Sequence, residues 1–231
     1  TVMMNHELGA TVGVARAHGQ TGAFVSRWNI NANAGNLVVN SGRDHNTSAA
    51  DVSIVNGAAQ FNRFCSADLA APSAYQFGGL GTSSRIFMNG EEAGNEGRAF
   101  AHIASGADMN KTYQLPRLGK FSWENSVASP FAQQKTIVMG TDDSTPGQVY
   151  MYVGNKTASG NDIERAGLTN GNLYGVRVAG TLDESRASGA TGRFDMFNKG
   201  DVSALSGAQV QANSEANNVT EFLRPEDGAW D

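Results

Sequence analysis

The sequence predicts an all-β fold, and more specifically a β-propeller with few short helices. Short strand-like runs are separated by clusters of Gly, Asn, Asp and Ser, helical patterns are weak, and one strand-end motif recurs along the chain. The composition agrees, because glycine contributes 28 of 231 residues, about 12%, against roughly 7% in an average protein. Charged residues make up only 17%, so neutral polar groups dominate the surface of this turn-rich chain.

Ten runs of residues are expected to form strands. Several of them alternate apolar and polar side chains, which is the period of a strand with one buried face. Each run is bounded by turn-forming residues. The runs are 2–5, 22–30, 36–40, 51–55, 85–89, 97–104, 111–118, 136–140, 147–153 and 172–178.

Helical signals are few. The best pattern covers 201–216, where Asp201 or Ser203 is expected to cap the helix N-terminus. Residues 157–168 have room for one short helical turn, and 180–192 has the composition of a long surface loop.

A repeated motif favours the propeller among all-β folds. Met4-Asn5-His6-Glu7 has partial copies at Met88-Asn89-Gly90-Glu91 and Met139-Gly140-Thr141-Asp142, each followed by a glycine-containing loop and a second strand. The offsets are 84 and 51 residues, and one propeller blade takes roughly 40–50 residues. The chain length then corresponds to four or five blades. Short β-meanders also resemble one another by chance, which is the alternative.

Carboxylates gather at the predicted strand ends. Calcium binds six to eight oxygens from carboxylates, carbonyls and water, and paired acids beside Gly and Asn can supply them. The alternative is that these acids only cap and solvate hairpin turns. The candidates are Glu7, Glu91 with Glu92, Glu124, Asp142 with Asp143, Glu164, and Glu226 with Asp227.

Cysteine and histidine give weaker signals. Cys65 is the single cysteine, so no intrachain disulfide forms, and its thiol is either a small buried apolar group or a ligand for a transition metal. No two of the histidines (His6, His18, His45 and His102) have metal-ligand spacing. A structural part is therefore expected for each histidine.

Several function classes are excluded by what the sequence lacks. The formal net charge is −5 and there is no run of Lys or Arg, which argues against nucleic acid or an anionic membrane as a partner. No apolar run is long enough for a transmembrane segment. No P-loop, G-x-S-x-G, HExxH or paired CxxC pattern is present. The abrupt ends predict a piece of a longer protein, with any export signal upstream.

Arg224 and Glu226 stand two residues apart in RPEDG. On a strand, side chains at this spacing point the same way. The arginine can then recognise a metal-bound phosphate or carboxylate through two parallel hydrogen bonds. A plain strand-end salt bridge is the equal alternative.

Seven stretches resemble the PhoX-type alkaline phosphatases and their uncharacterised relatives. They cover about half of the chain and run from end to end. The stretches are MNHELG, FNRFCSADL, RIFMNGEEAG with the nearby EGRAFAHI, LPRLGKFSWENSVASP, TIVMGTDDSTPGQVYMYVG, NDIERAGLTNGNLYGVRV and FLRPEDGAWD.

The resemblance implies a six-bladed propeller, exported to the periplasm or cell surface, that hydrolyses phosphate monoesters at a calcium and iron site in its channel. It puts Glu7, Glu124 and Glu226 among the metal ligands. It also makes Cys65 the iron ligand and Arg224 the phosphate-binding arginine. The repeated motif adds a further set of candidate metal ligands, which are Glu91, Asp142 and Asp143.

A second function stays open beside the phosphatase. The stretch NGAAQFNRF before Cys65 carries no acidic residue, and SADLAAPSAYQF follows it where the family has a Gly-rich, Trp-containing stretch. With the Asn-, Ser- and Thr-rich surface, this favours a non-catalytic calcium-binding propeller that acts in extracellular binding, adhesion or a matrix. Lactonase-like or phytase-like propeller hydrolases are further alternatives. The sequence does not predict the oligomeric state.

Overall fold

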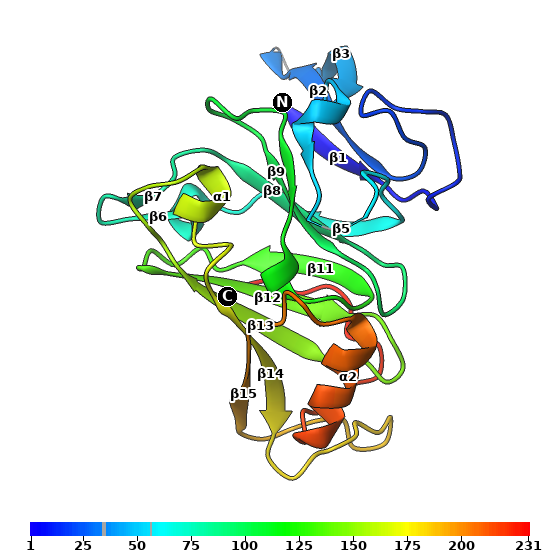
Figure 1. Ribbon diagram of the computed structural model, residues 1–231, viewed down its shortest axis with the longest axis vertical. Helices are drawn as coiled ribbons and strands as arrows, with labels where there is room; N and C mark the ends of the chain where they lie inside the picture. The colour runs from blue at the N-terminus through cyan, green and yellow to red at the C-terminus, as the bar shows by residue number, and fades with distance from the viewer. Residues whose placement is uncertain (34–35, 56) are drawn as a thin grey trace.

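Most of the regular structure in this protein is β. The computed structural model describes residues 1–33, 36–55 and 57–231, and its strands form three larger, mainly antiparallel sheets stacked along the long axis of Figure 1. A small fourth sheet pairs β6 (Gln76–Phe77) with β7 (Leu80–Gly81). The predicted all-β class is therefore confirmed.

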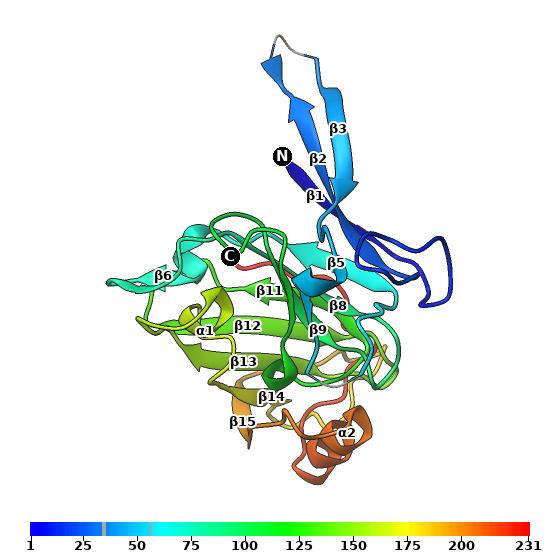
Figure 2. The same cartoon turned by 45° about the horizontal axis from the view of Figure 1, so that its top comes forward.

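The first sheet has the strand order β1-β2-β3. It consists of β1 (Val2–His6), β2 (Phe24–Asn31) and β3 (Val38–Asp44), all antiparallel. Figure 2 shows the far ends of β2 and β3 extending away from the rest of the molecule. The other end is buried, because Phe24, Val25 and Ser26 start β2 inside the core. The last residues of β1 pair with this buried end of β2.

The second sheet has the order β4-β10-β9-β8-β5. A proline shortens one predicted strand here, because Pro116 has no N–H for the ladder and begins a 3₁₀ turn after Gln114. β4 pairs parallel to β10, while the other strands of the sheet are antiparallel. The bounds are β4 (Val52–Ser53), β5 (Phe64–Asp68), β8 (Ile86–Glu91), β9 (Ala99–Ile103) and β10 (Thr112–Gln114).

The third sheet is a five-stranded antiparallel meander, β11-β12-β13-β14-β15. Its strands follow one another in sequence order, and each pairs antiparallel with the next. The bounds are β11 (Trp123–Ala128), β12 (Lys135–Asp142), β13 (Val149–Asn155), β14 (Asn172–Val178) and β15 (Phe194–Gly200). The strand predicted over 172–178 has those ends in the structure.

Helix is limited, in the described residues, to α1 (Asp162–Arg165), α2 (Gly207–Ala216) and short 3₁₀ turns. The prediction of a helix from 201 was wrong at its start. Ser206 is the N-cap, its hydroxyl accepting from the amide of Gln209 while Gln209 accepts in return. Segment 180–192 contains neither strand nor helix, as predicted. None of the helices described has both the length and the apolar character to cross a bilayer.

Five of the described strands were not predicted: β5, β6, β7, β11 and β15. The blade count also differs, because the described residues form three larger sheets rather than four or five, and these sheets do not close into a ring. The second and third sheets each take in a longer stretch of chain than one blade of 40–50 residues would.

The main core lies between the second and third sheets and is centred on Trp123. Its indole lies against two glycines of neighbouring strands, Gly90 on β8 and Gly140 on β12. A Cβ added to Gly90 would lie 2.3 Å from the Cβ of Trp123, and one added to Gly140 would lie 2.6 Å from the ring. The ring also stacks on Phe121, with centroids 4.0 Å apart. These glycines allow the close approach that joins the two sheets.

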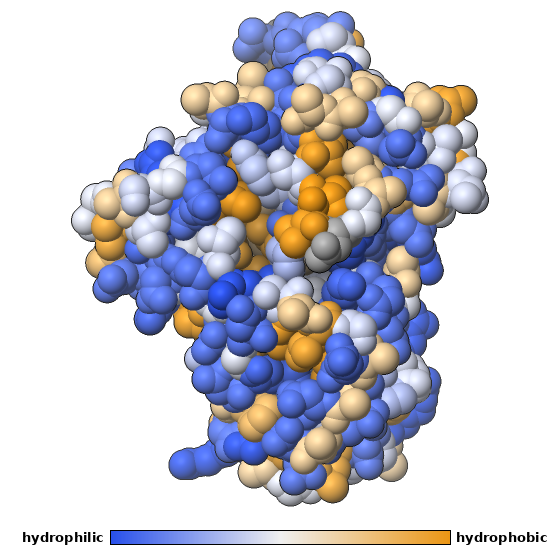
Figure 3. All heavy atoms as spheres, viewed as in Figure 1, coloured by the Kyte–Doolittle hydropathy of each residue, from blue (hydrophilic) through white to orange (hydrophobic). Residues whose placement is uncertain are grey.

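A smaller aromatic cluster joins the first and second sheets, and includes Phe61, Phe64 and Phe100. The outer surface is more polar. The face in Figure 3 is mainly hydrophilic, with apolar side chains gathered around a hollow near the middle of the view. An apolar pocket lies between β10 and the α1 segment and includes Ile54 and Leu168 in its lining.

Replacing Gly90 by alanine tests the tryptophan contact. The added methyl group has no free volume, so Gly90→Ala is expected to lower the free energy of unfolding by about 1–3 kcal/mol. Urea unfolding followed by Trp fluorescence measures the change. Gly228→Ala is the control, because nothing lies within 4 Å of that position. Equal stability of the two variants would contradict the packing described.

Two buried histidines predict a loss of stability in acid. His45 is fully buried and its pKa is lowered to about 4, chiefly by desolvation, with Arg27 and Arg43 also lowering it while the Lys111 carbonyl and Asp51 raise it. Burial likewise places the pKa of His102 well below 6.5. Both rings therefore stay neutral in the folded protein. In the unfolded chain they take up protons below their ordinary value of 6.5.

The unfolded state consequently binds more protons as the pH falls from 6.5 to 4, and stability is lost across that window. The lowering of the His45 pKa to about 4 corresponds to about 3 kcal/mol. His45→Gln, which does not titrate, is expected to show a shallower fall in melting temperature between pH 6.5 and 4. An unchanged slope would mean that His45 is not buried as a neutral ring.

Candidate metal centre

The inner edges of the three sheets meet around β5. This strand contacts β1 on one side and β11 on the other, although each belongs to a different sheet. β5 and β11 each contain a register shift, between Phe64 and Ala67 and between Trp123 and Asn125. Such bulges turn a side chain away from the regular alternation. Cys65 and Glu124 stand at these two bulges.

A chain of buried and partly buried hydrogen bonds fixes β1 to the second sheet. Asn5 donates from Nδ2 to the Cys65 carbonyl at 2.5 Å, and Asn89 donates from Nδ2 to Asn5 Oδ1 at 2.8 Å. His102 Nε2 donates to Asn89 Oδ1 at 2.9 Å, and its Nδ1 accepts from the hydroxyl of Thr112 at 2.8 Å. Each partner fixes the orientation of the next, so the backbone at Cys65 is held through four strands.

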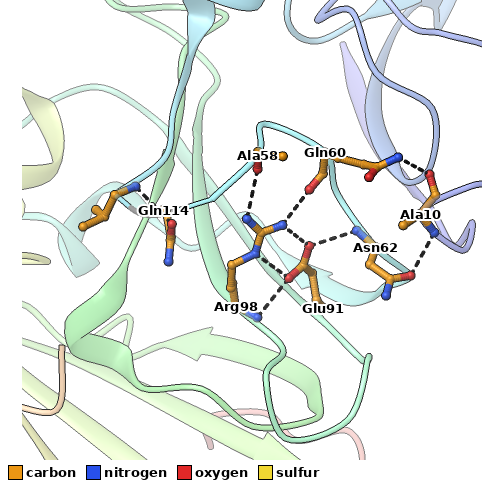
Figure 4. Close-up of polar contacts among 8 residues, drawn as sticks. Ala10, Ala58, Gln60, Asn62, Glu91, Arg98 and Gln114 are labelled. Carbon is orange, nitrogen blue, oxygen red and sulfur yellow. Dashed lines mark hydrogen bonds and ion pairs between the residues drawn. The ribbon is translucent and has the colours of Figure 1, made fainter. Parts of the chain in front are cut away.

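In the pairs Glu91–Glu92 and Asp142–Asp143, the first acid has a structural role. Glu91 is buried and its carboxylate receives Arg98 through Nε at 2.8 Å and Nη2 at 2.6 Å, as Figure 4 shows. The same carboxylate accepts from the backbone amides of Asn62 and Arg98. Its oxygens are therefore used within the fold, and it ties the segment before β5 to β8.

Asp142 does the same in the third sheet. It is 4% exposed and accepts from the backbone amide of Ser122 at 3.2 Å and from the Ser144 hydroxyl at 2.8 Å. Burial raises its pKa to about 6. Ser122 immediately precedes β11, so Asp142 fixes the entry to β11 as Glu91 fixes the entry to β5.

The second acid of these two pairs turns toward the shared centre. Glu92 follows β8 and Asp143 follows β12, and extended backbone directs neighbouring side chains to opposite faces. Ligand atoms of Glu7, Cys65 and Glu92 lie within 4.8 Å of one another. Those of Glu92, Glu124 and Asp143 do so as well, so Glu92 belongs to both groups. Three sheets thus contribute to one cluster.

The thiol of Cys65 is held as a hydrogen-bond donor. Its Sγ donates to Glu124 Oε1 at 3.1 Å, and the Ser66 hydroxyl donates to the same oxygen at 3.0 Å. Burial raises the pKa of Cys65, and the carboxylates of Glu124 and Glu92 raise it further. Burial also raises the pKa of Glu92. Negative charge is therefore disfavoured here until a cation enters.

Two arginines lie at the edge of the cluster. Arg63 contacts Glu7 through Nε at 2.8 Å and Glu92 through Nη2 at 3.1 Å. Arg224 makes two parallel bonds to Asp143, at 2.7 and 2.9 Å, which lower the pKa of Asp143. Both arginines have left-handed backbone, with φ of 34° and 57°. Such a conformation is uncommon outside Gly, Asn and Asp.

The donor types fit the two kinds of metal that the sequence suggested. Glu92, Glu124 and Asp143 offer only oxygen, which suits a hard cation. Glu7, Cys65 and Glu92 add a sulfur, which suits a transition metal. A bound cation would also lower the pKa values of Cys65 and Glu92, because its positive charge favours the thiolate and the carboxylate.

The structure therefore brings five sequence candidates together, Glu7, Cys65, Glu92, Glu124 and Asp143. It does not bring the others. Glu91 and Asp142 serve the fold as described, and Glu226 is 58% exposed at its side chain and lies 3.3 Å from Arg224 Nη2. His6 borders the cluster but stacks on Phe24 and bonds to Ser26.

Sequence reasoning named Glu92 only as the partner of Glu91, singled out Glu91 as the ligand, and did not find Arg63. For Glu92, the signal was the paired acid itself, since only one of two neighbours can face the centre. For Arg63, the signal was its place two residues before Cys65, the same spacing that relates Arg224 to Glu226.

Comparison with known proteins bears on the fold. No protein-family model matches the chain, and a search of curated proteins finds no match. Among solved structures, the chain resembles PhoX of Pseudomonas fluorescens, determined in complex with vanadate, a transition state analogue. The TM-score is 0.59 at 12% identity, over 97% of this chain. The match covers 52% of the PhoX chain, so this chain spans about half of that protein's length.

Calcium titration of chelator-treated protein tests the cluster. Because Glu92 belongs to both groups, Glu92→Gln is expected to weaken calcium binding at least about tenfold in isothermal titration calorimetry. Glu226→Gln is the matched control and should stay near the wild-type affinity. If Glu226→Gln lost as much affinity as Glu92→Gln, the placement of the centre would be incorrect.

Proposed function

We propose that this chain carries the metal centre of a phosphatase that hydrolyses phosphate monoesters with calcium and iron. The observation that carries the proposal is the convergence of Glu7, Cys65, Glu92, Glu124 and Asp143 from three sheets. The fold likeness to PhoX, whose structure holds a transition state analogue, supports it.

Each ligand has a distinct part in the proposal. Cys65 is assigned to iron because its thiolate is the one soft ligand, with Glu7 and Glu92 beside it. Glu124 and Asp143 complete an oxygen site for calcium with Glu92. When bound, the cations supply positive charge that offsets the oxygens of a phosphate group.

Arg224 is assigned to the phosphoryl group. Its side chain is 58% exposed at the rim of the cluster, and the planar fork of its guanidinium matches two phosphate oxygens. Glu226 forms an ion pair with the same guanidinium at 3.3 Å and so helps to orient it. By donating hydrogen bonds where charge develops, Arg224 would stabilise the transition state of phosphoryl transfer.

The proposal extends to the whole fold and its location. β1, β5 and β11 would be inner strands of adjacent blades around one channel, as in a propeller. The resemblance in sequence implies six blades in the complete protein and export to the periplasm or cell surface. The partners are then small phosphate esters rather than nucleic acid, in keeping with the net charge of −5.

One observation favours a second function, a non-catalytic calcium-binding propeller. Arg63 and Arg224 both have carboxylate partners within the cluster, and an arginine paired in this way is not offered to phosphate. Such a protein would bind calcium for stability and act in extracellular binding or adhesion.

Hydrolysis of p-nitrophenyl phosphate separates the two functions. The phosphatase proposal expects turnover that is lost with chelator and in Cys65→Ala. Arg224→Lys is expected to lower kcat/KM by about 10²–10³-fold. Arg177→Lys is the matched control, because Arg177 makes the same two-bond contact with Asp195, at 2.6 and 2.9 Å, away from the cluster.

The opposite result is equally clear. No turnover, together with a melting temperature that calcium raises, would contradict the phosphatase and support the calcium-binding protein. Equal loss of activity in Arg224→Lys and Arg177→Lys would show that Arg224 has no special part in the reaction.

A further inference from the structure

Arg63 occupies the ligands that the metal needs. Two of the three members of the sulfur-containing group contact its guanidinium: Glu7 accepts a hydrogen bond from Nε at 2.8 Å, and Glu92 forms an ion pair with Nη2 at 3.1 Å. A metal ion and a guanidinium both bind carboxylate lone pairs. Both cannot hold the same oxygens at full strength, and two positive charges at this distance repel each other.

We propose that Arg63 is an internal counter-ion of the metal centre. Without metal it neutralises Glu7 and Glu92, and a bound cation displaces it. The released guanidinium then binds an anion at the same centre. This inference rests on the proposed function and deepens it, because it names a residue that couples cation binding to phosphate binding.

The backbone of Arg63 is fixed while its side chain is free to turn. Its amide donates to the Leu8 carbonyl at 2.8 Å, and its carbonyl accepts from the amide of Glu92 at 2.9 Å. These two bonds hold it between the segments that carry Glu7 and Glu92. The side chain is half exposed, so it can leave the carboxylates without any change in the fold.

Arg224 stands in the same relation to the other group. It bonds to both oxygens of Asp143, and its own amide donates to the Ser144 carbonyl at 3.2 Å. Each group of ligands thus has one arginine on it. Arg63 is the sharper case, because it bridges two ligands and touches Glu92, the member common to both groups.

Competition for the carboxylates and release of the arginine together predict that binding of a cation and binding of phosphate are coupled. A cation must displace Arg63, so the arginine weakens cation binding. Once displaced, the arginine adds a donor for phosphate, so phosphate binds more tightly to the cation-loaded protein. By thermodynamic linkage, phosphate must strengthen cation binding by the same factor.

Removing Arg63 tests whether this arginine weakens cation binding. Calcium is titrated by calorimetry into chelator-treated wild type, Arg63→Gln and Arg177→Gln. Arg63→Gln is expected to bind calcium at least about fivefold more tightly than wild type, since a competing charge is gone. Arg177→Gln loses the same charge from an exposed ion pair elsewhere, so it controls for net charge and should change affinity less than twofold.

Titration with inorganic phosphate, with calcium at saturation, tests whether the released Arg63 strengthens phosphate binding. Arg63→Gln is expected to bind phosphate at least about fivefold more weakly than wild type, since one positive charge near the anion is lost. Arg63→Lys keeps the charge and should lie between the two. A stabiliser of the fold alone would not strengthen one ligand while weakening the other. Melting temperatures establish that each variant is folded.

The failures are distinguishable. If wild type binds calcium and Glu92→Gln does not, but Arg63→Gln binds calcium no more tightly than wild type, then the counter-ion inference is wrong and the metal centre stands. If no protein in the series binds calcium, both the inference and the proposed function are overturned.

Discussion

Repulsion among like charges is the constraint on which this structure depends. Four carboxylates and a thiol from three sheets lie within a few ångströms, where their negative charges oppose one another. Two arginines, Arg63 and Arg224, offset part of this negative charge. The raised pKa values of the Cys65 thiol and the Glu92 carboxyl also reduce it. A fold would not gather such groups for stability, because dispersing them over the surface would remove the repulsion. The arrangement indicates a site shaped for cations.

Two pairs of neighbouring acids, Glu91–Glu92 and Asp142–Asp143, connect the scaffold to this cluster. In each pair one side chain stabilises the fold and the other faces the cluster. Glu91 and Asp142 fasten the entries to β5 and β11, and their neighbours Glu92 and Asp143 face the centre. The alternation of an extended chain gives both results from two adjacent residues. Behind them, Trp123 packs against glycines of β8 and β12, so the sheets that supply the ligands share one core.

The sequence predicted much of this, and its failures have a common cause. Regular alternation identified most strands, including 172–178 to the residue. The strands it missed include β5 and β11, whose bulges at Cys65 and Glu124 interrupt the two-residue period. A pattern method is therefore weakest where a side chain is turned out of register to reach a site. The resemblance of the surrounding stretches to the PhoX-type family singled out Cys65 and Glu124 as candidate ligands where the strand pattern did not.

The ligand choice within the acid pairs could not be read from sequence for a different reason. The strand-end motif fixed the position of each pair but not which member faces the centre, and the partners that decide this, Arg98 and Ser122, are distant in the chain. Arg63 is a similar case, because its carboxylates come from β1 and β8 segments that only the fold brings together.

The central claim is that cations occupy the cluster around Glu92. Elemental analysis of protein purified without added metal, followed by anomalous diffraction at the iron edge and at a wavelength sensitive to calcium, tests it most directly. The account predicts bound calcium or iron, with anomalous peaks among Glu7, Cys65, Glu92, Glu124 and Asp143. Protein that contains neither metal, or peaks confined to other parts of the molecule, would contradict it.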